Sequence, residues 1–591
     1  MSVSPAHTQA PRLASRRGAA VIAAVRAHPG APVFALYLLA AIIVERNAMA
    51  HLAGVCACNA GSAYPPRFSV PTAFMWALKW WPHALVHLQN PLTSYDIWTP
   101  QGLDLARATS VPIAALVVSP LTALFGPVVT FNILSILGPA TGAWAAYRLC
   151  LYVSRRQLPS VLAGYLYGFS SYELAHLLGL VHTTLIFCAP VCVLLALKRL
   201  DERISVRRYV VLLALTLIVQ LLLSTELFLT LTTMAVATFV IAWLFAPAYR
   251  DRLRRLVPST VLAYGVTAVL CVVYLYYALA RGSGYSIGAG YTYVSDALNF
   301  VIPTRITWLG GTLFGSVTNN FTGEIGEQGA YLGLPLIAML VMYFIQARRT
   351  VAARILLGVI VVAGVWSLGA KLHVKGPTRL DLPAVVLAHL PVFDELAPAR
   401  IALYLSLAAS VAVALWLSSP RAAPWRWGLA ALAVIFLIPA TNATYPGTRV
   451  AMFHSPVRMP RFFSSGMYRS YLRRGEVILP LPWANQGASM LWQANTDFYF
   501  RMASGHFGAP PPAYKAWPVV TQLRGNAPEP RAAAGLRSFI ATHDVGAIVQ
   551  DPNWSAAWTP VIRRLGLTGA NAGGVIVYRI PASWGAAAAA R

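Results

Sequence analysis

Long runs of apolar residues alternate with short polar segments up to about residue 444. The runs Val210–Phe245 and Ile355–Ala370 show this pattern most clearly. A helix of about 20 apolar residues crosses the hydrocarbon core of a bilayer. A helix also satisfies its own backbone hydrogen bonds in lipid. The pattern therefore predicts a polytopic α-helical membrane protein.

We expect about 11 to 13 spans, each following one apolar run. Their approximate bounds are 33–51, 108–126, 128–151, 159–176, 181–198, 209–224, 226–246, 257–281, 330–346, 354–370, 399–418 and 428–443. Polar loops at 52–106, 282–329 and 371–398 interrupt them. Within the first of these loops, Thr72–Gln89 is rich in tryptophan and amphipathic, which is typical of a helix lying in the membrane interface.

Arginine marks one side of the predicted bundle. Its clusters include Arg155–Arg156, Arg250–Arg255 and Arg348–Arg349, and the basic tail 1–30 precedes the first span. Cytoplasmic loops carry such an excess of basic residues. The three long loops and the C-terminal region then lie outside, which requires an odd number of crossings. We expect 108–126 to be re-entrant, and the alternative is that the tryptophan-rich segment crosses.

Residues 445–591 lack the long apolar runs of the preceding part of the chain. Segments 475–482, 546–550 and 574–579 read as short strands, and 536–543 reads as a helix before the second strand. Alternation of strands and helices predicts a small α/β domain, which we expect to be extracytoplasmic and soluble by itself.

Composition narrows the functional classes. The chain has 591 residues, of which 57% are hydrophobic and 11% are charged, with a net charge of +27. The basic residues lie between spans, so we exclude a nucleic-acid partner. No P-loop, G-x-S-x-G, H-E-x-x-H or paired C-x-x-C motif occurs. Cys56 and Cys58 could bind a metal or a partner's thiol, but a pair without such a role is the favoured interpretation.

Several segments resemble a known superfamily. They are WALKWWPHALVHLQNPLTSYDIWTPQGLDLARATSVP from Trp76, DALNFVIPT from Asp296, EQGAYLGLPL from Glu327 and LPVFDELAPARIALY from Leu390. Together they are similar to a group of bacterial multipass proteins in the GT-C glycosyltransferase superfamily. The resemblance implies transfer of a sugar from a polyprenyl-phosphate donor to a lipid, glycan or protein acceptor. It places this reaction at the outer face of the bacterial inner membrane. No cofactor is required, although Mg²⁺ or Mn²⁺ could assist.

The resemblance also implies an acidic residue in the first outer loop as catalytic base or as orienter of the acceptor. Members of the group carry Asp-Pro before the tryptophan-rich helix, whereas this chain has Val70-Pro71. Asp96 and Asp104 lie later in the same loop and could replace it, or each could be a solvated loop acid. Asp296 and Glu327 are the catalytic candidates from other outer loops.

Substrate-binding candidates complete the prediction. Arg400, Lys371 and Lys375 could bind phosphate, and arginine is well suited because its guanidinium forks onto oxyanions. A carboxylate beside apolar spans, such as Glu226, is costly unless it is paired or functional. The remaining candidates are on the tryptophan-rich segment: Trp80, Trp81 and His83. We assign no metal ligands. A non-catalytic scaffold of the same fold and a flippase for lipid-linked glycans are the alternative functions.

Overall fold

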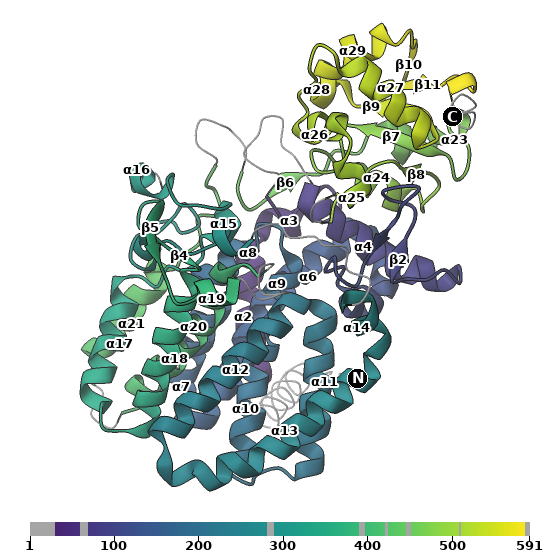
Figure 1. Ribbon diagram of the computed structural model, residues 1–591. Coiled ribbons are helices and arrows are strands. Elements are labelled where there is room, and N and C mark those ends of the chain that lie inside the picture. Colours follow the sequence, from purple (N-terminus) through teal and green to yellow (C-terminus); the bar gives the residue numbers. More distant parts are fainter. Residues whose placement is uncertain are drawn as a thin grey trace, which may run out of the picture.

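The computed structural model describes residues 30–59, 69–279, 289–311, 313–388, 396–419, 423–444, 451–507 and 510–584. A helical bundle forms most of the molecule, and a smaller sheet-containing domain lies at one end of it (Figure 1). The predicted division into a helical part and a C-terminal α/β part is confirmed.

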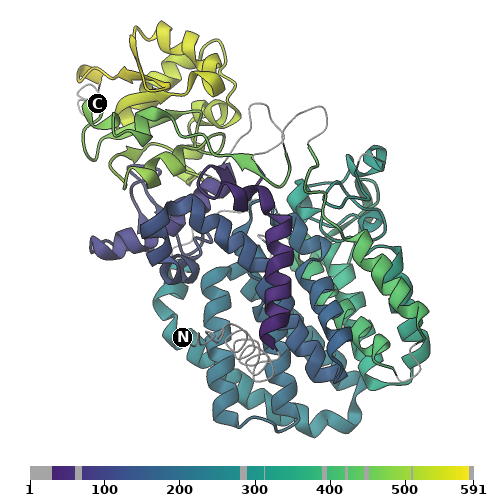
Figure 2. The ribbon, with the colours of Figure 1, turned by 180° about the vertical axis from the view of Figure 1, so that it is seen from behind.

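The bundle consists mainly of apolar helices. Their bounds are α2 (Gly30–Val44), α6 (Ser119–Ser154), α7 (Gln157–Gly168), α10 (Cys188–Leu200), α11 (Val206–Leu223), α12 (Thr225–Phe245), α13 (Arg250–Leu270), α14 (Val272–Leu279), α17 (Leu334–Ala347), α18 (Val351–Ser367), α20 (Ala402–Leu417) and α21 (Trp425–Phe436). Figure 2 shows α2 lying along α6.

Five segments of the described chain are long and apolar enough to cross a membrane. They are Ser119–Ser154, Val181–Leu200, Val206–Leu223, Thr225–Phe245 and Pro398–Leu417. Helices α13 and α14, bent by 79°, make a sixth if they count as one span. Four shorter apolar helices, α2, α17, α18 and α21, lie beside them. The chain is therefore a multi-pass membrane protein.

The apolar run 108–126 does not form one straight helix. It contains α5 (Pro112–Val117) and the beginning of α6, and α6 is broken at Gly126, which has φ 83°. Glycine adopts this conformation without the steric cost of a Cβ atom. The break fits a re-entrant segment, and its depth in the membrane stays a prediction.

The tryptophan-rich helix α4 (Ser69–Val86) lies inside the protein and not at a lipid surface. Trp76, Trp80 and Trp81 are buried between the bundle and the C-terminal domain. Their indole N–H groups donate to Gln493 Oε1 at 2.7 Å, Pro91 O at 3.1 Å and Ser110 Oγ at 3.1 Å. The predicted interfacial position is therefore wrong, because protein supplies both the apolar cover and the acceptors.

The C-terminal domain is built on a five-stranded sheet in the order β10-β11-β9-β7-β8. Its strands are β7 (Val477–Leu481), β8 (Arg501–Met502), β9 (Val545–Gln550), β10 (Gly569–Ala572) and β11 (Val575–Arg579). Strand β7 pairs in parallel with β8 and β9, and β11 is antiparallel to β9 and β10. The main helices are α24 (Ser489–Asn495), α26 (Pro518–Gly525), α27 (Ala532–Thr542) and α29 (Thr559–Arg564). The three predicted strands and the predicted helix are present.

This domain shares one hydrophobic core with the first long loop, 52–106. The core joins the tryptophans of α4 to the buried side of the sheet. In addition, β1 (Val55–Cys56) pairs with β6 (Ser455–Pro456). Next to this pair, Cys56 and Cys58 form a buried disulfide with each other, which the sequence interpretation had not favoured. The shared core argues against the expectation that the domain folds alone.

Candidate functional site

A buried ion cluster lies where several helices of the bundle end. Arg400 belongs to η5 (Pro398–Ile401), Glu226 to the first turn of α12, and Glu327 to η3 (Ile325–Glu327). Arg400 Nη2 lies 2.5 Å from Glu327 Oε1, and Arg400 Nη1 donates to Glu226 Oε2. Arg400, Glu226 and Glu327, which the sequence indicated as separate candidate residues, are thus in contact.

Local structure holds both carboxylates in place. The Ser224 side chain caps α12 by accepting from Leu227 N, so that Glu226 lies in the positively polarised first turn. Glu226 Oε1 also accepts a hydrogen bond from Ala397 N at 2.9 Å. Arg400 Nε donates to both oxygens of Glu327, at 3.1 and 3.3 Å. The guanidinium is therefore fully engaged by protein carboxylates.

Two histidines extend this cluster. His176, at the end of α8 (Ser171–His176), has Nε2 at 3.5 Å from Glu327 Oε2, and its Nδ1 lies 2.7 Å from Tyr172 O. Each ring nitrogen of His176 thus faces an oxygen that can accept a hydrogen bond. His182, in α9 (Val181–Thr184), has Nε2 at 3.5 Å from Arg400 Nη1. An arginine donates only, which favours neutral His182 with its hydrogen on Nδ1.

The charge of Glu327 is fixed by its neighbours. Burial favours the neutral carboxyl, but Arg400 and His176 outweigh burial and hold the pKa of Glu327 well below its ordinary value. A carboxylate with such a low pKa is a weak base, because general bases work best with a pKa near the operating pH. The cluster is suited to positioning and electrostatic stabilisation, and not to proton abstraction.

Asp96, in contrast to Glu327, has a carboxyl group whose pKa is raised. Its backbone carbonyl accepts from Met502 N and from Gln493 Nε2, both at 2.8 Å, so the loop is fixed against the C-terminal domain. Its half-buried carboxylate accepts no hydrogen bond within the described part of the chain. Burial raises the pKa of Asp96 to about 6, although Arg501 acts in the other direction. This is a suitable pKa for a general base near neutral pH.

The other two predicted catalytic acids, Asp104 and Asp296, accept hydrogen bonds from nearby groups of the protein. Asp104 Oδ1 accepts from Thr93 Oγ1 at 2.8 Å in the small hairpin of β2 (Thr93–Ser94) and β3 (Leu103–Asp104). Asp296 caps η2 (Ala297–Phe300), with Oδ1 at 3.0 Å from Leu298 N and Oδ2 at 2.9 Å from Gly376 N. Both carboxylates have structural partners, and neither contacts the Arg400 cluster.

The lysines predicted to bind phosphate lie together on another hairpin. Strands β4 (Lys371–His373) and β5 (Pro377–Asp381) form it, and Lys371 Nζ lies 3.7 Å from Asp381 Oδ1. Lys375 is in the turn between the strands, with φ 57°. These lysines therefore form a separate, exposed feature, away from the buried carboxylates that hold Arg400.

The candidates on α4 face protein. Trp80 and Trp81 are buried, and His83 Nδ1 lies 3.4 Å from Asp497 Oδ1 of the C-terminal domain. Lys79 Nζ lies 3.4 Å from the same oxygen. These contacts attach α4 to the C-terminal domain, which leaves the two tryptophans no open face for a substrate.

Sequence interpretation missed Glu173, His176 and His182. Both carboxylate oxygens of Glu173 and Nδ1 of His182 are buried without a hydrogen-bond partner in the described chain. The polar residues within the apolar stretch YELAHLLGLVHTT, from Tyr172, were an available signal. In a chain of buried spans, such residues indicate structural pairing or function.

Helix α4 connects the two parts of this region. The Phe74 ring stacks on His182 with centroids 5.0 Å apart, and Trp76, two residues further on, donates to Gln493. Gln493 in turn donates to the Asp96 carbonyl. The Arg400 cluster and the Asp96 loop are thus joined through adjacent positions of one helix.

No family model matches the chain, and no curated protein matches it in sequence. Solved structures of an oligosaccharyltransferase from Archaeoglobus fulgidus follow a chain path similar to that of this protein. Its complex with an inhibitory peptide and a dolichol-phosphate, there named AglB, has a TM-score of 0.45 at 12% identity, covering 94% of this chain and 75% of that one. The apo form has a TM-score of 0.48 at 12% identity, covering 94% and 74%. The form tethered to an acceptor peptide gives 0.44 at 13% identity, covering 94% and 75%. All three TM-scores lie below 0.5, so we base no argument on this likeness.

Proposed function

We propose that this protein is an integral membrane glycosyltransferase. It moves a sugar from a polyprenyl-phosphate donor to a lipid, glycan or protein acceptor at the outer face of the bacterial inner membrane. The C-terminal domain then lies outside the cytoplasm. The observation that carries the proposal is the Asp96 carboxylate, half-buried where the first outer loop meets the C-terminal domain, with a pKa of about 6.

Asp96 acts as the general base in this proposal. An acceptor oxygen attacks the anomeric carbon of the sugar and forms a new C–O bond, while the C–O bond to the donor phosphate breaks. Asp96 takes the acceptor proton, and the polyprenyl phosphate leaves with the electron pair of the broken bond. The lipid-linked phosphate is itself the leaving group, so the step needs no nucleotide-binding fold.

Arg400 has a positioning role instead of the phosphate contact suggested by its sequence position. Its guanidinium already binds Glu226 and Glu327, and its side chain is only 12% exposed. Glu226 is the more open of the two carboxylates, with 16% exposure against 5% for Glu327. Glu226 is therefore the member of the cluster best placed to hydrogen-bond a sugar hydroxyl.

A matched pair of variants in one loop tests the proposal. Removing a general base lowers the rate by roughly 10²–10⁴-fold. Asp96→Asn should therefore abolish measurable transfer in proteoliposomes supplied with polyprenyl-phosphate sugars. Asp104→Asn, which weakens the hairpin contact with Thr93, should retain most of it. Near-normal transfer by Asp96→Asn would remove Asp96 from the mechanism.

A non-catalytic scaffold is the second candidate, and one observation favours it. Val70, at the beginning of α4, occupies the position at which the resembling group carries aspartate. The scaffold predicts no transfer by the wild-type protein with any polyprenyl-phosphate sugar. Gain of transfer in Val70→Asp would then support this second candidate.

A further inference from the structure

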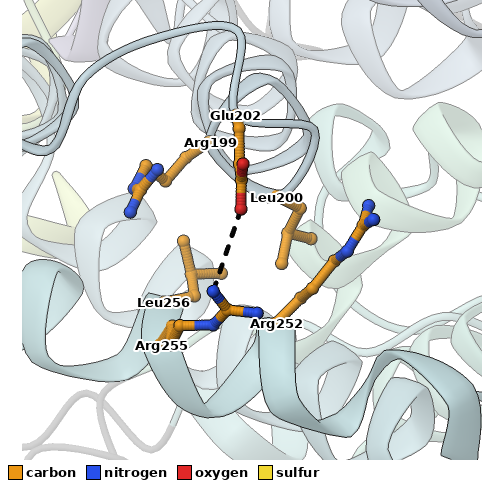
Figure 3. A pocket seen from close by; sticks show the side chains of 6 residues that line it. All are labelled: Arg199, Leu200, Glu202, Arg252, Arg255 and Leu256. Atoms are coloured by element: carbon orange, nitrogen blue, oxygen red, sulfur yellow. Dashed lines mark ion pairs between the residues drawn. The ribbon is translucent and has the colours of Figure 1, made fainter.

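A basic hollow lies between the end of α10 and the beginning of α13, apart from the site described above. It is shallow and open to solvent, and it is lined by Arg199, Leu200, Glu202, Arg252, Arg255 and Leu256. Figure 3 shows the arginines of α13 on one side, with Arg199 and Glu202 across from them and the two leucines between. An apolar surface is thus bordered by charged groups.

The charge of this lining is not balanced. Three arginines face one glutamate, so two positive charges are left over. Arg255 Nη1 lies 3.9 Å from Glu202 Oε1. Arg199 and Arg252 pair with no carboxylate of the described residues. Arg199 Nε is also buried without a hydrogen-bond partner in that part of the chain. The lining therefore carries a net positive charge, which suits an anionic ligand.

Exposed apolar side chains follow farther along α13. Val257 and Val261 are 41% and 63% exposed, and their spacing of four residues places these two on one face of the helix. A ligand that fits both features has a phosphate at one end and an acyl chain at the other. Helix α10 ends here and α13 begins here, so the hollow lies at the depth of lipid headgroups.

We propose that this hollow binds the phosphate headgroup of an anionic phospholipid, whose acyl chain extends over the apolar surface of the bundle. Arg199 and Arg252 supply charge-assisted hydrogen bonds to the phosphate oxygens. Leu200 and Leu256 contact the glycerol and the first methylenes. The site is independent of glycosyl transfer and lies among the arginine-rich loops of the bundle.

Native mass spectrometry of the full-length protein in detergent tests this proposal. Phosphatidylglycerol, phosphatidylcholine and glycerol 1-phosphate are each titrated against the wild-type protein and Arg199→Gln/Arg252→Gln. Basic residues at a membrane surface each contribute about fivefold to the binding of anionic lipid. We expect the double variant to bind phosphatidylglycerol roughly tenfold or more weakly. The wild-type protein should prefer phosphatidylglycerol to both other ligands.

The control is Arg348→Gln/Arg349→Gln, which removes the same charge from the exposed turn between α17 and α18. It should bind phosphatidylglycerol as the wild-type protein does, and circular dichroism should show both double variants folded. Equal loss in the two variants would mean general surface charge and would overturn the proposal. Binding of glycerol 1-phosphate as tightly as the lipid would identify a soluble phosphate as the ligand and would also overturn it.

Discussion

Trp76 Nε1 donates a hydrogen bond to Gln493 Oε1 at 2.7 Å, across 417 residues of sequence. The same amide donates from Nε2 to the carbonyls of Asp96 and Phe500, each at 2.8 Å. Gln493 is fully buried. One side chain thus joins the tryptophan-rich helix, the loop that carries Asp96 and the C-terminal domain.

Loss of this amide should loosen the C-terminal domain. Gln493→Ala leaves the Trp76 indole N–H and the Phe500 carbonyl buried without partners, at a cost of about 1–3 kcal/mol each. We expect a lower melting temperature in detergent and faster proteolysis of the C-terminal domain. Gln522→Ala is the control, since that partly exposed side chain accepts one backbone hydrogen bond, from Glu529. If the two variants had the same melting temperature, the claim that Gln493 holds these three segments together would be refuted.

Arg400 should be essential to stability, because it is the counter-ion of two buried carboxylates. Arg400→Met leaves Glu226 and Glu327 without their shared counter-ion, and breaking a buried ion pair costs about 3–5 kcal/mol. Arg426→Met is the control, because Arg426 is buried but donates to the Trp416 carbonyl and Gln346 and lies over the Trp416 ring, with no carboxylate of the described residues as its partner. Thermal unfolding in detergent should show a larger loss for Arg400→Met. Neutralising both glutamates in that background should restore part of the loss.

Asp96 should destabilise the folded protein at neutral pH. Its pKa is raised to about 6 by burial, against about 3.9 in an unfolded chain. Between these values the folded state binds more protons, so stability falls as pH rises from about 4 to 6. Asp96→Asn should therefore be more stable than wild type at pH 7.5, by about 1–2 kcal/mol in the free energy of unfolding. At pH 4 the variant and the wild-type protein should melt at similar temperatures. Asp381→Asn, which removes a carboxylate from an exposed pair with Lys371, is the control.

The same pKa sets the pH dependence of the reaction. A general base must be ionised, so transfer should rise with pH through about 6 and then level off. Rates measured from pH 4.5 to 8 with saturating donor provide the test. A curve that is flat between pH 5 and 7 would exclude Asp96 as the base.

The apolar helices and the strands of the C-terminal sheet could be predicted because they depend on local patterns of apolar residues. Of the 11 to 13 expected spans, however, only five or six in the described chain are long and apolar enough to cross a membrane. The Arg400 cluster could be predicted only as separate residues. Glu327 and Glu226 are 73 and 174 positions from Arg400, and no local pattern encodes their contact. The tryptophans of α4 were misplaced for a related reason. An amphipathic aromatic helix looks the same against lipid as against protein, and its partner Gln493 is far away in sequence.

The donor class is the central claim, and vesicles of defined orientation test it most directly. Right-side-out membrane vesicles containing the protein receive either a labelled polyprenyl-phosphate sugar or the corresponding nucleoside-diphosphate sugar. The account predicts transfer of label to acceptor from the lipid-linked donor alone, and none from vesicles containing Asp96→Asn. Transfer from the nucleotide sugar, or undiminished transfer by the Asp96→Asn protein, would contradict it.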